Sequence, residues 1–79
     1  MDAVEYLKAC MEEAEDDAAL IAAALGDIAR AYGLSKLARE VGISRVGLHK
    51  ALNRAGNPSF ATVLRVTHAL GLKLVPVAA

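Results

Sequence analysis

The spacing of hydrophobic positions predicts two helices in the N-terminal part of the chain. Apolar residues recur every three or four positions over 3–14 and again over 18–31, which is the period of a helix with one buried face. Asp16 and Asp17 separate the two stretches, and an aspartate there can accept hydrogen bonds from the free amides that begin a helix. Gly33 is a natural end for the second helix. The two stripes consist of Val4, Leu7, Met11 and Ala14, and of Leu20, Ile21, Ala24, Leu25 and Ile28.

Shorter helices are predicted in the rest of the chain, over 35–41, 44–53 and 60–70. The stretch 54–58 has the composition of a loop, and Ser59 can cap the helix that follows it. The residues of this last helix that we expect to face the core are Phe60, Val63, Leu64, Thr67 and Leu70.

The end of the chain predicts a short β-strand. Gly71 is placed to end the last helix, and residues 72–77 then alternate for a few positions before a β-branched end. A lone strand is not stable in water, so we expect it to pair with its copy in a second subunit. Pro76 restricts the strand to an edge. The residues expected at this dimer interface are Leu72, Leu74 and Val75.

Composition favours close packing between short helices. Hydrophobic residues make up 56% of the chain and aromatic residues 4%, and alanine, which favours helix, dominates the hydrophobic set. Gly26 lies inside the second predicted helix at a cost of about 1 kcal/mol relative to alanine. Either another helix approaches closely at this position or the cost is tolerated. The chain is therefore expected to be one all-α domain of residues 1–79, with a short C-terminal strand.

The charges separate along the chain although their sum is zero. Residues 1–27 contain eight acidic residues and one basic residue, whereas residues 28–79 contain eight basic residues and one acidic residue. A basic segment can face phosphates even when the whole chain is neutral. The acidic run 12–17 is either a solvated helix end or a docking patch for a basic protein.

Residues 34–53 have the pattern of two short helices that cross through a tight turn. Ala38 is small where the second helix passes over the first, and Gly42 permits the positive φ that the turn needs. Ile43 fills the gap between the helices, and Ser44 can cap the second one. The core that the two helices share is expected to consist of Leu37, Val41, Leu48 and Leu52.

This stretch resembles the Cro/CI-like (XRE-type) helix-turn-helix repressors. The matching positions are 37–38, 42–45, 48 and, after the next helix, 70–72. The chain is still more similar to one bacterial branch, the probable addiction-module antidote proteins, or antitoxins, through 20–31, 48–52 and 56–64. The resemblance implies a five-helix, lambda-repressor-like domain, with N-terminal helices over 1–33, the helix-turn-helix over 34–53 and the last helix and dimerisation strand over 54–79.

The same resemblance implies roles in DNA binding. In the related repressors the first turns of the second helix reach base edges in the major groove, which corresponds to Arg45, Val46 and Lys50. Leu34 stands where many of these proteins place a phosphate-binding glutamine, and Val46 and Gly47 offer few hydrogen bonds, which leaves room for shape-dependent readout. The residues placed for phosphates are Ser35, Lys36, Ser44, His49, Asn53 and Arg54.

No pattern in the sequence indicates an enzyme, a metal site or a cofactor. His49 and His68 have no cysteine or aspartate at ligand spacing, and Cys10 is expected to be a buried structural thiol in a reducing compartment. The first residues are acidic, unlike a signal peptide, and no apolar run approaches the ~20 residues of a membrane span. A cytoplasmic protein is expected.

The sequence thus predicts a dimeric DNA-binding antitoxin. By resemblance it would repress its own operon by binding double-stranded operator DNA and would neutralise a cognate toxin, a small basic protein. Two alternatives stay open: a stand-alone phage-type repressor without a toxin, and a protein-interaction module in which the helix pair is only scaffold.

Overall fold

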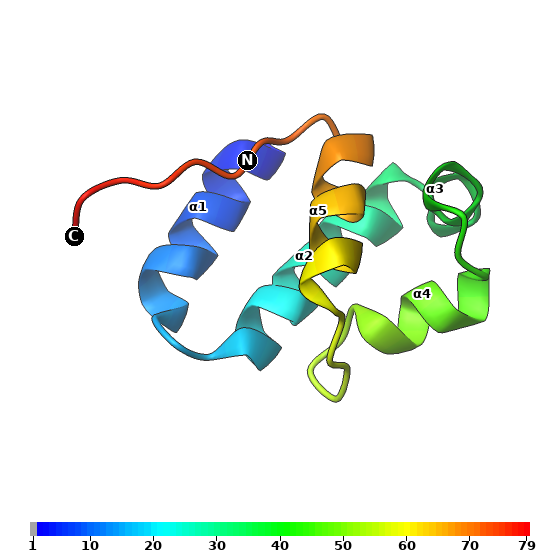
Figure 1. Ribbon diagram of the computed structural model, residues 1–79, viewed down its shortest axis with the longest axis horizontal. Helices are drawn as coiled ribbons and strands as arrows, with labels where there is room; N and C mark the ends of the chain where they lie inside the picture. Colours follow the sequence, from blue (N-terminus) through cyan, green and yellow to red (C-terminus); the bar gives the residue numbers. More distant parts are fainter. Residues whose placement is uncertain (1) are drawn as a thin grey trace.

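The computed structural model describes residues 2–79, and every regular element within that range is a helix (Figure 1). The prediction of five helices is confirmed, and no predicted boundary differs by more than two residues. In chain order the helices are α1 (Ala3–Ala14), α2 (Ala18–Tyr32), α3 (Leu34–Val41), α4 (Arg45–Ala51) and α5 (Phe60–Ala69).

The helices are arranged so that α1 lies at the end of the molecule opposite α3 and α4 (Figure 1). The molecule measures 35 × 24 × 22 Å, and Figure 1 shows α1 at one end of the long axis and α3 and α4 at the other. Helix α1 packs on α2, while α3 contacts α2, α4 and α5. The acidic α1 is therefore separated in space from the basic helices α3 and α4 (Figure 1).

Side chains just before the helices fix where they begin. The carboxylate of Asp17 accepts a hydrogen bond from the backbone N–H of Leu20, and the Ser59 hydroxyl accepts one from Thr62, which confirms both predicted caps. Asp2 caps α1 in the same way through Glu5. Gly33 closes α2 by donating its N–H to the Ala29 carbonyl. The helices are thus delimited by local hydrogen bonds.

The core is built mainly around α3 and α4. Its largest fully buried apolar side chains are Leu25, Leu37, Leu48, Leu52 and Val66. Gly26 answers the question that the sequence left open, because a Cβ atom there would overlap the backbone carbonyl of Leu52. An alanine at this position would force a shift between α2 and the end of α4, which approach each other closely there.

Two expectations are wrong. Residues 72–77 do not form a strand, because within residues 2–79 no neighbouring strand offers backbone hydrogen bonds to them. Phe60 does not face the core: its side chain is 71% exposed, because it begins α5 at a point that the other helices do not cover.

No single helix within residues 2–79 is long and apolar enough to cross a membrane. By length and composition α2 and α3 together pass that test, but the pair bends by 107° between them.

Candidate nucleic-acid interface

The turn between α3 and α4 has the geometry that its residues predict. Gly42 adopts the left-handed conformation, with φ of 73°. The backbone N–H groups of Gly42 and Ile43 both donate to the Ala38 carbonyl, at 3.0 and 3.1 Å, which closes α3 tightly. Ala38 is buried and Ile43 packs half-buried on the core, so the prediction of a small residue and a filling residue is confirmed. The two helices are held in one fixed arrangement.

Helix α4 presents one face to solvent. Arg45, Val46, His49 and Lys50 are all exposed, and their spacing places them side by side on the outer surface of the helix. Leu48 lies on the opposite side and is fully buried. The predicted base-contacting residues therefore share a surface, and the 63% exposed Val46 adds an apolar spot to it.

The beginning of α4 is fixed by its predicted cap. The Ser44 hydroxyl oxygen accepts a hydrogen bond from the backbone N–H of Gly47 at 3.0 Å. A Cβ atom on Gly47 would come within 2.9 Å of that same Ser44 oxygen. The small residue in the first turn thus keeps room for the cap, which holds Arg45 and Val46 in place.

The outer face of α3 carries charge that is partly engaged within the chain. Ser35, Lys36 and Arg39 are exposed there, but the Lys36 ammonium lies 4.6 Å from the centre of the Tyr32 ring. The Tyr32 hydroxyl donates to the Glu40 carboxylate, which lies 2.8 and 2.9 Å away through its two oxygens. The single acid of residues 28–79 is therefore held beside Tyr32.

Asn53 and Arg54 follow α4, and they differ in what their side chains do. The Asn53 amide donates to the His49 carbonyl at 2.9 Å and accepts from the Ala55 N–H at 2.8 Å. Both polar atoms of Asn53 thus serve to end the helix. Arg54 is exposed.

Sequence patterns missed two residues that support this surface. Arg65 reaches from α5 to donate to the Val41 carbonyl at 3.3 Å, across 24 residues of sequence. Tyr32 holds both Lys36 and Glu40, as described above. No short-range signal identifies either contact, because each depends on how separate helices pack.

The predicted dimer-interface residues have unequal environments in the single chain. Leu72 and Leu74 are half-buried and pack against the chain's own core. Val75 and Val77, by contrast, are 67% and 86% exposed. The exposed apolar surface of the tail lies mainly beyond Leu74.

The histidines and the cysteine do not form a metal centre. His49 and His68 are exposed on different helices, and within residues 2–79 no three side chains of His, Cys, Asp or Glu gather as metal ligands would. Cys10 is half-buried against the core.

Asp27 marks the border between the acidic and basic parts of the chain. It accepts a hydrogen bond from the Tyr6 hydroxyl at 2.6 Å and pairs with Arg30 at 3.0 Å. The Tyr6 hydrogen bond, together with Arg30, lowers the pKa of Asp27. The same hydrogen bond to the carboxylate raises the pKa of Tyr6 to about 12. The contact ties α1 to α2.

Fold and surface together define a small all-helical protein with an exposed basic helix pair at one end. Its residues 1–78 match the family model of probable addiction module antidote proteins, and the chain belongs to that family. The chain is 54% identical over 68 residues to a protein of Haemophilus influenzae described as uncharacterized. The aligned residues make up 86% of this chain and 68% of the relative. No solved structure matches.

Proposed function

We propose that this protein is a DNA-binding antitoxin that represses its own operon. The observation that carries the proposal is the outer face of α4, where Arg45, Val46 and Lys50 are exposed together on a rigid helix. Arginine can bind guanine through two hydrogen bonds, and a valine methyl suits the methyl group of thymine. The methyl groups of an exposed valine between cations are better suited to contact base edges than to remain in water.

Phosphate contacts would come from the surrounding residues. Ser35, Lys36, Ser44, His49 and Arg54 are exposed around α3 and α4. Arg39 is an exposed cation of the same surface and joins this set. Asn53 would act mainly by ending α4, because both of its polar atoms are already used. Contacts of this kind position a protein on DNA without specifying sequence.

The antitoxin role rests on family membership, since antidote proteins of addiction modules oppose a toxin. In this proposal the partner is a protein toxin encoded beside the gene, and the antidote has no catalytic role and needs no cofactor. Because an operator is reached in the cytoplasm, the protein would act there.

A homodimer belongs to the same proposal. Operators read by paired helices are commonly near-palindromic, which matches a two-fold symmetric protein. The exposed Val75 and Val77 offer apolar surface for a second copy. Light scattering behind a sizing column tests this, and a monomer at all concentrations, with and without DNA, would contradict it.

The decisive experiment compares DNA binding by two double variants. Arg45→Ala/Lys50→Ala removes two cations from the outer face of α4, and Lys8→Ala/Lys73→Ala removes two exposed cations elsewhere. In fluorescence anisotropy with the duplex upstream of the gene, the first variant should lose about 100-fold in affinity, since each base contact is worth roughly 1–3 kcal/mol. The control should lose about threefold or less, an effect of general charge.

The alternatives give different outcomes in the same assay. A protein-interaction module would not distinguish the upstream duplex from a scrambled one, with or without the α4 substitutions. A stand-alone repressor would show the DNA preference but would bind no protein encoded beside it. Equal affinity of the folded α4 variant and the wild type would refute the proposed DNA surface.

A further inference from the structure

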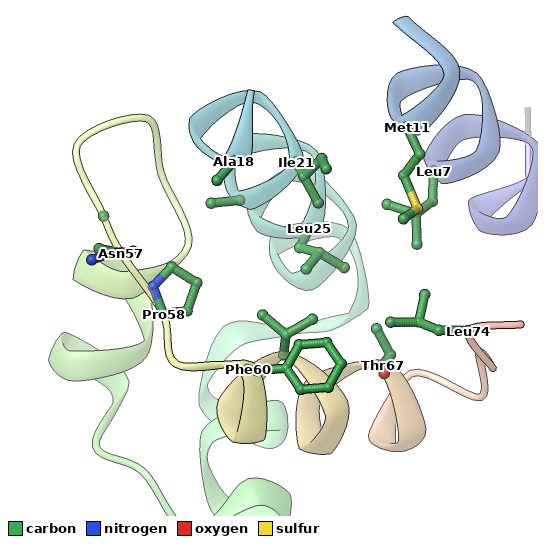
Figure 2. A pocket seen from close by; sticks show the side chains of 13 residues that line it. Leu7, Met11, Ala18, Ile21, Leu25, Asn57, Pro58, Phe60, Thr67 and Leu74 are labelled. Carbon is green, nitrogen blue, oxygen red and sulfur yellow. The ribbon is translucent and has the colours of Figure 1, made fainter. Parts of the chain in front are cut away.

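The molecule has an apolar groove that is separate from the outer face of α4. Its cavity volume is about 290 Å³, and α1, α2, α5 and the chain before and after α5 enclose it. No residue of α3 or α4 lines it. Figure 2 shows the side chains that point into this space, among them Leu7, Met11, Ile21, Phe60 and Leu74.

The groove presents carbon almost throughout. Its one hydroxyl, from Thr67, donates to the Leu64 carbonyl within its own helix at 2.9 Å and is satisfied. Phe60 stands at the edge with 71% of its surface exposed, and Met11 opposite it is 39% exposed. An aromatic side chain that remains this exposed beside an apolar hollow is typical of a surface that another protein covers.

A run of acidic residues joins the two helices α1 and α2 that line one side of the groove. Met11 and Ala18 both line it, and the segment between them contains Glu12, Glu13, Glu15, Asp16 and Asp17, which we call the acidic rim. All five side chains are exposed. Within residues 2–79 none of these carboxylates forms an ion pair; the pair that does form there is Arg30–Asp27. Asp17 caps α2, and no cation of the described chain neutralises the other four carboxylates, which are therefore open to a basic partner.

We propose that this groove and its acidic rim are the docking site for the toxin, through an apolar side chain flanked by lysine or arginine. The inference rests on the proposed antitoxin function, which requires a protein partner. Charge complementarity selects the partner: the rim repels nucleic acid and attracts a basic protein. A second copy fits less well, because its own basic surface is the one that the proposal assigns to DNA.

The groove is separate from the surface that the proposal assigns to DNA. Since α3 and α4 contribute nothing to the groove, toxin and DNA would occupy separate surfaces of one antitoxin molecule. Substitutions in the groove should therefore weaken toxin binding and leave DNA affinity unchanged.

Titration calorimetry with the purified protein encoded beside the gene tests the apolar part. Phe60→Ser removes the most exposed large apolar side chain of the groove and should raise the Kd by at least about tenfold, as for an aromatic hot spot of an interface. Val4→Ser is the matched control, because it removes a 59% exposed side chain that does not line the groove and belongs to no proposed interface. Its Kd should stay within about twofold of the wild type.

Charge reversal tests the acidic rim, with one substitution in the rim at the end of α1 and a control outside the rim at its beginning. Glu12→Lys lies in the last turn, where a cation suits the helix dipole, so folding should not suffer. It should raise the Kd about threefold or more at low salt, and less at high salt as the charges are screened. Glu5→Lys makes the same change in the first turn and should have little effect.

The outcomes separate this inference from the function on which it rests. Tight toxin binding that Phe60→Ser and Glu12→Lys leave unchanged would overturn the groove assignment while the antitoxin role stands. Absence of binding by the wild type would overturn both. A wild-type dimer that Phe60→Ser converts to a monomer would show that a second copy occupies the groove, and would also overturn the assignment.

Discussion

The two ends of the molecule use hydrophobic residues in opposite ways. At the end formed by α3 and α4, the large apolar side chains Leu37, Leu48 and Leu52 are fully buried, and the outer face is mostly polar or cationic. At the end formed by α1, the start of α2 and α5, Phe60 and Met11 remain exposed beside an acidic segment. One end is closed and basic, and the other is open and acidic.

This contrast in burial and charge determines which partner each end can accept. When a partner binds a closed, cationic surface, little apolar area is removed from water. The free energy of binding then comes mainly from the neutralisation of phosphates, which suits DNA. An open apolar groove gains by removing carbon from water, which suits a protein. A small domain can thus present two chemically distinct surfaces if large apolar side chains remain exposed on only one of its ends.

The largest effect should come from truncating a buried apolar side chain at the closed end, and an exposed one at the open end provides the contrast. Leu48→Ala leaves a cavity in the closed end and should lower the free energy of unfolding by roughly 2–5 kcal/mol. Phe60→Ala removes more atoms, yet should cost only about 0.5 kcal/mol or less because the ring is mostly solvated. Urea denaturation followed by circular dichroism measures both, and equal losses would erase the contrast between a closed and an open end.

A smaller effect is expected where the two ends meet. Gly26→Ala places a Cβ against the Leu52 carbonyl, and the overlap should cost about 1–3 kcal/mol despite the better helix propensity of alanine. Ala23→Gly in the same helix is a useful control, with a cost of about 1 kcal/mol from propensity alone. An increase in the melting temperature of Gly26→Ala would show that α2 and the end of α4 are not in close contact.

The smallest effect concerns the pH dependence of stability at the border residue Asp27. Its pKa is lower in the folded protein than in the unfolded chain, so its contribution is present above pH ~4 and is lost as pH falls through the folded pKa. Because the side chain is 57% exposed, solvent screening should keep the contribution below about 1 kcal/mol. Asp27→Asn should therefore show a slightly weaker loss of stability between neutral and acidic pH.

Tyr6 gives the opposite sign at alkaline pH. Its folded pKa of about 12 lies above its ordinary value of 10.0, so the unfolded chain ionises first and stability falls as pH rises between these values. Urea titrations at several pH values measure both limbs. Identical pH profiles for the wild type and Asp27→Asn would contradict the hydrogen bond between Tyr6 and Asp27.

Local signals in the sequence predicted most of the helical architecture. Asp17, Ser44 and Ser59 each cap a helix, and Gly42 adopts a positive φ, because these features depend on a few neighbouring residues. The exposed face of α4 followed from helical spacing, since the buried Leu48 occupies one side of the helix and leaves the opposite side to solvent. Short-range chemistry determines such features.

Long-range packing decided what the sequence pattern left open or predicted wrongly. Phe60 falls on the apolar stripe of its helix, but periodicity does not tell how far neighbouring helices extend to cover it. The tail has strand-like alternation, yet a strand exists only if another segment supplies its hydrogen bonds. Arg65 and Gly26 likewise depend on partners far along the chain, Val41 and Leu52.

The separation of charge along the 35 Å axis gives a neutral protein a permanent dipole moment. A net charge of zero means that a distant polyanion exerts almost no overall pull on the molecule. It exerts a torque instead, which turns the basic end toward the polyanion and the acidic end away. Encounters would therefore be pre-aligned, and the fraction that is productive should fall as added salt shortens the reach of the field.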